Sequence, residues 1–395
     1  MLKKPIEMLL EKSSTAFYTF DTTILKKRIC HLRDRIPSFV SLCYAVKANT
    51  FIIRELAEKV DRFEVCSPGE ADICAALKIP SEKIVISGVY KTPSFIEGLL
   101  ADAGFKGIFT VESMQQYELF CKTPAKRGRI PLLLRLTNES QFGINEADIE
   151  KIISHRDAFP RIEILGIQFF SGTQKTSAKK LAREIRRLGA LLQRLKDEYG
   201  YEARELEYGP GFPVSYFPAD SCHEEELFQA LSDALLSLDG RPKIILELGR
   251  SIAASCGRYY THIVDIKQNG GQNYLLTDGG MHHLVYYGQH MAMKQPAFHV
   301  VGKESAPPAG QWNICGSLCS MNDILVKQAT LPQVQEGDTL CFLNTGAYCM
   351  TEGISLFLSR DLPSIYLLQE NGDIVEARGS FETSLLNTPN YERKF

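Results

Sequence analysis

The sequence predicts an α/β protein in which a (β/α)8 barrel of the TIM type is followed by a C-terminal all-β domain. Its 395 residues are more than one compact core usually holds, so we expect two domains. Eight short apolar or β-branched runs alternate with helical stretches in the first part of the chain. This alternation is typical of a parallel sheet, and eight repeats favour a closed barrel over an open sheet of about five or six strands.

The barrel elements can be taken in chain order. The clearest helix is expected over residues 177–199, where leucine and isoleucine recur at three- and four-residue steps (Leu181, Ile185, Leu188, Leu192 and Leu195). The basic side chains of this helix are expected on its solvent-facing side. The predicted strands are VSLCYAV (40–46), FEVCS (63–67), IVISG (84–88), GIFTVES (107–113), PLLLRLT (131–137), EILGIQFF (163–170), ELEYG (205–209) and KIILELG (243–249).

A different pattern begins at Gly257, where strand-like runs follow one another with turns between them. These runs cover residues 258–266, 273–280, 338–346 and 364–370. We therefore expect residues 23–256 to form the barrel and residues 257–395 to form the β domain. Residues 1–22 include the strand-like FYTFD and are expected to join the β domain.

Composition excludes several classes of protein. Lys and Arg number 45 against 47 Asp and Glu, a formal net charge of −2, so neither nucleic acid nor a membrane surface is expected as a partner. No apolar run reaches the roughly 18 residues of a membrane span. Eleven cysteines are scattered along the chain, which indicates free thiols and a cytoplasmic protein rather than a secreted disulfide framework.

Candidate chemistry lies at the carboxyl ends of the barrel strands, where barrels of this type place their active sites. Lys47 closes the first strand, and a partly buried lysine there is a good Schiff-base nucleophile. A lysine that only extends along the rim is the alternative. Glycine turns follow the sixth and seventh strands, and Arg250 follows Glu247 after the eighth. A lysine, an acid and a phosphate cradle together match the needs of pyridoxal phosphate.

These residues resemble the fold-type III pyridoxal-phosphate decarboxylases, the group of diaminopimelate, ornithine and arginine decarboxylases. The resemblance covers nearly the whole chain and implies an alanine-racemase-like barrel with pyridoxal 5'-phosphate as cofactor. The motifs that carry it are YAVKANT, FEVCSPGE, GPGFP, ELGRSIAASCG, CGSLCSMNDIL and NTGAYCMT, in that order.

The resemblance implies a role for each matching residue. Lys47 would form the imine with the cofactor, Glu64 would lie near it, and Glu247 would pair with the pyridine nitrogen. Arg250 would hold the phosphate, and Tyr348 would touch the phosphate or the ring. The other expected cofactor contacts are Arg135, Phe170, Thr173, Gly209 and Gly211.

Cys319 and Asp323 fall on the motif that reaches across a dimer interface in this family. The resemblance therefore implies a homodimer with shared active sites, in which Cys319 donates a proton and Asp323 contacts the substrate. A buried apolar thiol is the alternative for Cys319. No metal site is expected, because Cys315 and Cys319 lack companion ligands. A carboxylate facing the pyridine nitrogen favours a quinonoid-forming decarboxylase over an alanine racemase, where an arginine stands instead.

Departures from the family pattern concern the substrate. Phe170 replaces the usual ring-stacking histidine, and Pro210 removes one N–H from the phosphate loop. Ser320 replaces the acid that follows the motif cysteine, and Tyr286 stands where diaminopimelate decarboxylases have arginine. The adjacent His282 and His283 are candidate substrate contacts or ordinary core residues, and their adjacency disfavours a metal site.

These departures resemble the branch that decarboxylates amino acids conjugated to citrate or held on a carrier protein, in siderophore or antibiotic pathways. We therefore expect a decarboxylase for a conjugated or carrier-bound amino acid. Diaminopimelate decarboxylase and a diamine-forming ornithine or lysine decarboxylase are the alternatives. A cofactor carrier without catalysis is disfavoured by the intact Cys319 motif, and a racemase would need a second base such as Tyr286 or Tyr287.

Overall fold

The computed structural model describes residues 3–240, 242–289 and 291–390. The chain divides into two compact units. A barrel unit contains Ile29–Val214 and Cys222–Ile252. A β unit contains Met1–Arg28, Ser215–Ser221 and Ala253–Phe395. Residues 215–221 lie within the range predicted for the barrel but belong to the β unit.

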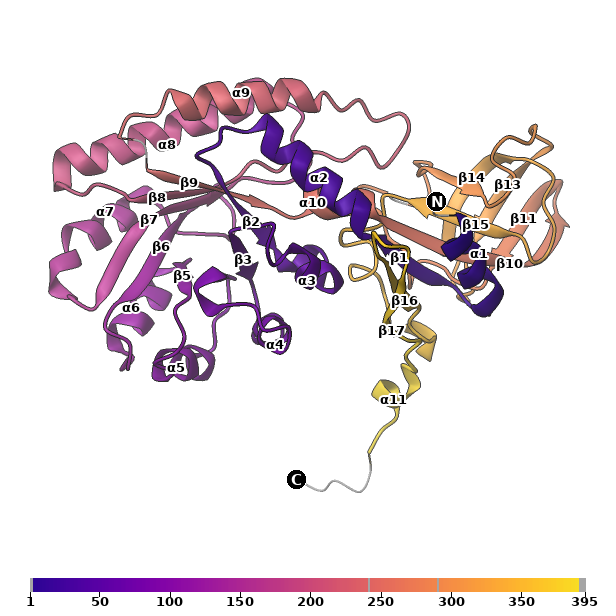
Figure 1. The fold of residues 1–395 in the computed structure, drawn as a ribbon, viewed down its shortest axis with the longest axis horizontal. Helices are drawn as coiled ribbons and strands as arrows, with labels where there is room; N and C mark the ends of the chain where they lie inside the picture. The colour runs from indigo at the N-terminus through magenta and orange to yellow at the C-terminus, as the bar shows by residue number, and fades with distance from the viewer. Residues whose placement is uncertain (1–2, 241, 290, 391–395) are drawn as a thin grey trace. The chain divides into compact units, whose positions relative to one another are not determined.

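Eight parallel strands form the closed barrel, in the order in which they occur in the chain (Figure 1). Pairing of the first strand with the last, which aligns Cys43 with Glu247, closes it. The predicted barrel is confirmed, and every strand lies on its predicted run. The strands are β2 (Ser41–Ala45), β3 (Arg62–Val65), β4 (Ile84–Ile86), β5 (Ile108–Val111), β6 (Ile130–Leu136), β7 (Ile162–Phe170), β8 (Glu205–Gly209) and β9 (Lys243–Leu248).

Helices follow the strands and cover the outside of the barrel, where α8 and α9 lie side by side (Figure 1). Their starts are fixed by caps, since Ser113, Asn145 and Ser177 each accept a backbone N–H from the first turn. The helices are α2 (Thr22–Arg35), α3 (Ile53–Leu56), α4 (Pro68–Ala76), α5 (Pro93–Ala101), α6 (Met114–Lys122), α7 (Glu146–Ser154), α8 (Ala178–Tyr199), α9 (Glu224–Leu236) and α10 (Arg250–Ala253).

The predicted long helix is α8, and its apolar stripe faces the barrel as expected. One position differs, because Leu191 is buried in the stripe whereas Leu192 is only half-buried. Inside the barrel, the layer formed by Val85, Ile108 and Leu133 is apolar. Polar side chains on β3, β7, β8 and β9 also contact one another, among them Arg62, Glu205, Gln168 and Glu207.

The second unit is mostly β-sheet, which confirms the predicted all-β domain. Its strand β1 lies between two others, antiparallel to β10 and parallel to β16. A short helix lies near each end of the described chain: α1 (Lys3–Lys12) and α11 (Ser384–Asn387). The strands are β1 (Phe17–Asp21), β10 (Gly257–Asn269), β11 (Gln272–Thr277), β12 (Phe298–Val300), β13 (Gly310–Cys315), β14 (Ile324–Leu331), β15 (Thr339–Leu343), β16 (Ser364–Leu368) and β17 (Ile374–Arg378).

All eleven cysteines lie within the described residues, and each is a free thiol. This agrees with the expectation from their scattered spacing. Among the helices of the described chain, none is both long and apolar enough to cross a membrane.

Phe109 on β5 gives a test of the barrel core. Its ring is fully buried and packs against Phe105 and Phe120 at 5.7 and 5.0 Å between ring centroids. Phe109→Ala should lower the free energy of unfolding by about 3–5 kcal/mol, because it leaves a cavity that the rigid barrel cannot fill. The same change at Phe39, which is 48% exposed, should cost less than about 0.5 kcal/mol in denaturant unfolding. Equal losses at the two sites would contradict this account.

Candidate active site

Lys47 lies in a short 3-10 turn, Val46–Ala48, directly after β2. Its Nζ donates a short hydrogen bond to Oε2 of Glu64 on β3 and lies 3.5 Å from Oε1 of Glu247 on β9. Cys66 Sγ is 3.8 Å from the same nitrogen. The lysine side chain is 39% exposed, whereas the two carboxylates are 3% and 10% exposed. Three of the predicted residues therefore meet at one rim, with the amine accessible from outside.

Burial and neighbouring charges shift the pKa values of the two carboxyl groups in opposite directions. Burial raises the pKa of Glu247, and the nearby Glu64 charge raises that pKa further. Burial also tends to raise the pKa of Glu64. The charge of Lys47 and its hydrogen bond have a larger, opposite effect, so the pKa of Glu64 lies below its ordinary value. Glu64 is thus ionised beside the ammonium. Glu247 is a group that takes a proton readily unless a cation faces it.

Further polar side chains inside the barrel contact Glu247 or lie near it. They were not among the residues predicted from the sequence. Gln168 on β7 donates from Nε2 to Oε1 of Glu207 at 2.8 Å and to Oε2 of Glu247 at 3.3 Å. Arg62 on β3 makes two 2.7 Å hydrogen bonds to Glu205. The available signal was alternation: Gln168 stands two residues before Phe170, and Glu207 two residues before Gly209, so each pair faces the same side of its strand.

The loops after β7 and β8 are joined into one small cradle. Lys175 N donates to Gly211 O at 2.9 Å, and the Gln174 amide pairs with both backbone groups of Val214. Gly211 has a φ of +62°, and a Cβ there would overlap the carbonyl oxygen of Gly172. Only glycine fits this crossing of two loops.

The predicted phosphate residues lie beside this cradle. Arg250 Nε donates to Thr173 Oγ1 at 3.3 Å, so the arginine that follows β9 reaches the loop that follows β7. A Cβ at Gly209 would overlap the ring of Phe170, which therefore packs closely against the end of β8. Two glycines, a hydroxyl and a guanidinium at one rim can hold a phosphate.

A buried carboxylate behind the cradle fixes its shape, and no pattern in the sequence pointed to it. Glu184 on α8 accepts hydrogen bonds from Ser171 at 2.6 Å and from Lys175 and Tyr208 at 2.7 Å each. Burial acts to raise the pKa of Glu184, but these three donors lower it below its ordinary value. The helix is thereby tied to both loops of the cradle.

Arg135 is held by its neighbours on the barrel. It pairs with Glu112 at 2.9 Å and lies over the Phe142 ring at 4.9 Å from the centroid. Its side chain is 10% exposed. The predicted contact of Arg135 with the cofactor stays a prediction.

The predicted residues of the β unit are described within that unit. Cys319 is exposed and Ser320 half-buried, in the turn between β13 and β14. Asp323 is 2% exposed, and its two carboxylate oxygens accept the backbone N–H groups of Met281 and Leu318. The carboxylate thus ties two loops together, and the predicted contact of Asp323 with the substrate stays a prediction. Tyr348 follows β15 and has a φ of +64°.

His283 and Tyr286 also use their polar atoms within the β unit. The ring nitrogens of His283 face the Tyr259 hydroxyl at 3.1 Å and Asp361 O at 2.8 Å, which favours the core role over the substrate role. Tyr286 OH donates to Leu343 O at 2.6 Å. His282 is 1% exposed, and its ring lies tilted against His283 with 3.8 Å between the ring centroids. The ring has no hydrogen-bond partner within the described residues. Burial holds the pKa of His282 down at about 3.

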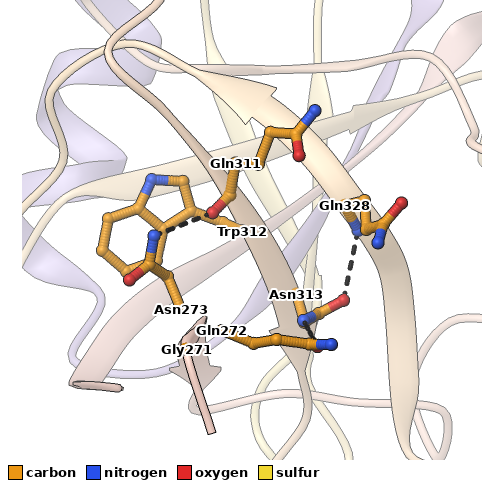
Figure 2. A pocket seen from close by; sticks show the side chains of 7 residues that line it. All are labelled: Gly271, Gln272, Asn273, Gln311, Trp312, Asn313 and Gln328. Carbon is orange, nitrogen blue, oxygen red and sulfur yellow. Dashed lines mark hydrogen bonds between the residues drawn. The ribbon is translucent and has the colours of Figure 1, made fainter. Parts of the chain in front are cut away.

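A hollow of about 430 Å3 lies on the β unit, between β11, β13 and β14 (Figure 2). Its amide groups bond to one another, with Asn313 Nδ2 donating to Gln272 Oε1 at 3.0 Å and Asn273 Nδ2 donating to Gln311 O at 3.1 Å. The ring of Trp312, the only tryptophan in the chain, lies beside Asn273. None of the predicted site residues lines this hollow, and its lining carries no charged or nucleophilic side chain.

An accessible lysine between two buried acids, with a glycine cradle and an arginine at the same rim, defines an enzyme that binds pyridoxal phosphate. The crowded Gly211 and the paired Thr173 and Arg250 fit a phosphate, and Glu247 fits a cationic ring nitrogen. The model of the pyridoxal-binding domain of pyridoxal-dependent decarboxylases matches residues 23–254. The chain belongs to this family of pyridoxal-phosphate-dependent amino-acid decarboxylases.

Individual relatives are distant in sequence but similar in length. The chain is 27% identical to the diaminopimelate decarboxylase of Aquifex aeolicus, over 87% of the chain and 84% of the relative. It is 24% identical to the L-glutamyl-[BtrI acyl-carrier protein] decarboxylase of Niallia circulans, over 95% and 94%. A crystal structure of diaminopimelate decarboxylase from M. jannaschii with L-lysine has the same fold, with a TM-score of 0.84, 23% identity and coverage of 96% and 92%.

Gly211→Ala tests the cradle. The added methyl group would push the two loops apart, so the affinity for pyridoxal phosphate should fall about tenfold or more, which is about 1.4 kcal/mol. Titration of cofactor-free protein, followed by absorbance, measures it. Gly200 ends α8 with a similar φ of +57° but has no atom within 4 Å of its Cβ position. Gly200→Ala therefore controls for backbone strain and should bind the cofactor normally. Equal affinities for both variants would contradict the assignment of the cradle.

Proposed function

We propose that this decarboxylase removes the α-carboxylate of an amino acid whose far end is conjugated or bound to a carrier protein. A free diamino acid has a charged group at its far end, and an enzyme specific for it needs a partner for that charge. The proposal depends on the absence of such a partner at the two positions where the resemblance leads us to look for it.

The main support for the proposal is the hydrogen bond of Tyr286 to a backbone carbonyl. This residue stands where diaminopimelate decarboxylases have an arginine, and its hydroxyl donates to Leu343 O at 2.6 Å from a fully buried position. Tyr286 therefore offers no cation to a second carboxylate. Ser320, which follows Cys319, offers no charge to a distal ammonium. The relative that acts on a glutamyl group of an acyl-carrier protein aligns over 95% of this chain, which supports the same reading.

The residues of the barrel would hold the cofactor as follows. Lys47 would attach it covalently, Glu247 would face its ring nitrogen, and the cradle at Gly211 with Thr173 and Arg250 would hold its phosphate. When bound, pyridoxal phosphate supplies an electron sink that lets the bond between the α-carbon and the carboxylate break. The Glu64 carboxylate accepts a hydrogen bond from the Nζ of Lys47 and would orient that nitrogen toward the cofactor.

A proton must then replace the lost carbon dioxide at the α-carbon. We assign this proton to the Sγ–H of Cys319, which is exposed on its turn and is supplied by a second subunit of a homodimer. The buried Glu247 carboxylate would keep the ring nitrogen of the cofactor protonated, because a cation there relieves the penalty of an isolated buried charge.

Diaminopimelate decarboxylase is the second candidate. Diaminopimelate decarboxylases are the more numerous relatives, and that of Aquifex aeolicus is 27% identical to the chain. A different group would then have to meet the second carboxylate of diaminopimelate.

A carbon dioxide assay separates the two candidates. The cofactor-loaded protein would be given pantetheine carrying L-glutamate as a thioester of its side-chain (γ) carboxyl group, citrate-acylated ornithine, and free meso-diaminopimelate, ornithine, lysine and arginine. We expect release from a conjugated amino acid and at least about 100-fold slower release from the free ones. Lys47→Ala, which cannot attach the cofactor, is the control. Rapid release from free meso-diaminopimelate would reject the carrier-bound substrate and support the second candidate.

Subunit mixing tests the shared site. Lys47→Ala and Cys319→Ala homodimers should each be inactive, and a random mixture should regain activity in proportion to about one intact site in four. Each mixed dimer would have one site with both residues intact. A mixture that stays inactive, although native mass spectrometry shows exchanged subunits, would contradict a site shared between subunits.

A further inference from the structure

The inside of the barrel holds more acids than cations. The charged residues that face one another there come from β3, β8 and β9 and from the turn after β2. They comprise two cations, Lys47 and Arg62, and four acids, Glu64, Glu205, Glu207 and Glu247. A third cation, the half-exposed Lys243 on β9, reaches only Glu205, at 4.0 Å. Cys43 on β2 and Gln168 on β7 also face this group and carry no positive charge. Arg135 on β6 is already paired with Glu112.

Two of the acids take up both cations. Arg62 binds Glu205 with two hydrogen bonds of 2.7 Å, and its Nη1 is 3.7 Å from Glu207. Lys47 donates its short hydrogen bond to Glu64. Glu207 and Glu247 have only longer contacts to these cations, 3.7 Å from Arg62 and 3.5 Å from Lys47. On the proposed function, the ring nitrogen of the cofactor supplies a further cation for Glu247, whereas Glu207 keeps only its longer contact with Arg62.

Gln168 connects these two acids. It is 1% exposed, and its Nε2 bonds to Oε1 of Glu207 at 2.8 Å and to Oε2 of Glu247 at 3.3 Å. An amide nitrogen carries two hydrogens, so one can serve each carboxyl group. Both bonds are made by the amide nitrogen, and the amide oxygen has no hydrogen-bond partner within the described residues. The amide nitrogen thus links the two carboxyl groups and helps to orient Glu247.

We propose that Gln168 is a positioning residue that holds Glu247 as a carboxylate for the ring nitrogen, and that Glu207 anchors it as a neutral carboxylic acid. The inference rests on the proposed function in one respect, the assignment of Glu247 to the ring nitrogen. A proton on Glu207 leaves Glu247 as the one acid in this group whose charge is open to the cofactor.

Burial supports the neutral state of Glu207. Its side chain is fully buried, and its Oε2 has no hydrogen-bond partner within the described residues. Burial raises the pKa of Glu207 to about 7, against the opposing charge of Arg62, and it raises the pKa of Glu247 to about 8. Glu207 therefore keeps the proton in preference to Glu247 only when the cationic ring nitrogen faces Glu247 and holds that group ionised. A second ionised carboxylate next to Glu247 would raise the pKa of Glu247. The proton would then move from the ring nitrogen to Glu247, and the ring would lose its positive charge.

The first experiment reads the ring nitrogen directly. Protein loaded with pyridoxal phosphate labelled with nitrogen-15 in the ring gives one chemical shift when that nitrogen is protonated and another when it is not. Wild type should show the protonated nitrogen. Gln168→Leu should show a large unprotonated fraction at neutral pH, with kcat about tenfold lower and KM little changed. Glu207→Gln should keep the protonated ring nitrogen, because the glutamine amide is uncharged and has nearly the same shape as a protonated glutamate.

Gln116→Leu is the matched control. Gln116 is another buried amide of the barrel, 8% exposed, which bonds to Lys91 and to the backbone of Glu112. Its loss should lower stability but leave the nitrogen-15 shift as in wild type. A wild-type shift in Gln168→Leu, or an unprotonated ring in Glu207→Gln, would overturn the proposal.

The second experiment needs no cofactor. The pKa of Glu207 is about 7 in the folded protein, against an ordinary value of 4.5. A raised pKa means that the folded protein loses stability as the pH rises between these two values. Glu207→Gln removes that titration, so its melting temperature should fall less than that of wild type between pH 5 and pH 8. Equal slopes would mean that Glu207 is ionised and would overturn its role. Failure of wild type to bind the cofactor would instead reject the proposed function and leave this result standing.

Discussion

The hydrogen bond between the Lys47 ammonium and the Glu64 carboxylate is the interaction on which the barrel site depends. A lone charge inside a barrel is costly, and a lysine without an acid beside it would be driven to the neutral form or out to the rim. With Glu64 as its partner the amine is oriented and stays accessible. Glu247, whose contact with the same amine is longer at 3.5 Å, can then meet a cation brought in from outside.

Much of the barrel could be predicted because its signals are local. Eight apolar runs and the turn residues between them are visible without any knowledge of the fold, and Lys47, Glu64, Glu247 and Arg250 stand at the ends of such runs. The polar residues inside the strands were missed for a physical reason. Gln168 faces the barrel axis only because β7 pairs in one register, and a shift of one residue would turn it outward.

Residues distant in the chain were harder still. Glu184 sits on a helix where an acid usually faces water, and nothing nearby in the sequence indicates that Lys175 and Tyr208 bond to it. In the β unit, nothing in the sequence indicates that Asp323 and His283, both predicted substrate contacts, also bond to neighbouring backbone and side chains. Only three-dimensional packing distinguishes a polar residue that holds a loop from one that holds a ligand.

The single tryptophan gives this architecture a built-in reporter. Trp312 lies on β13, so the tryptophan fluorescence of the whole protein comes from the β unit, and the barrel unit contains none. Circular dichroism, by contrast, records the helices of the barrel. If a substitution confined to the barrel moves the midpoint of the tryptophan transition, the two units unfold as one cooperative block; if it moves only the circular dichroism, each unit has its own stability.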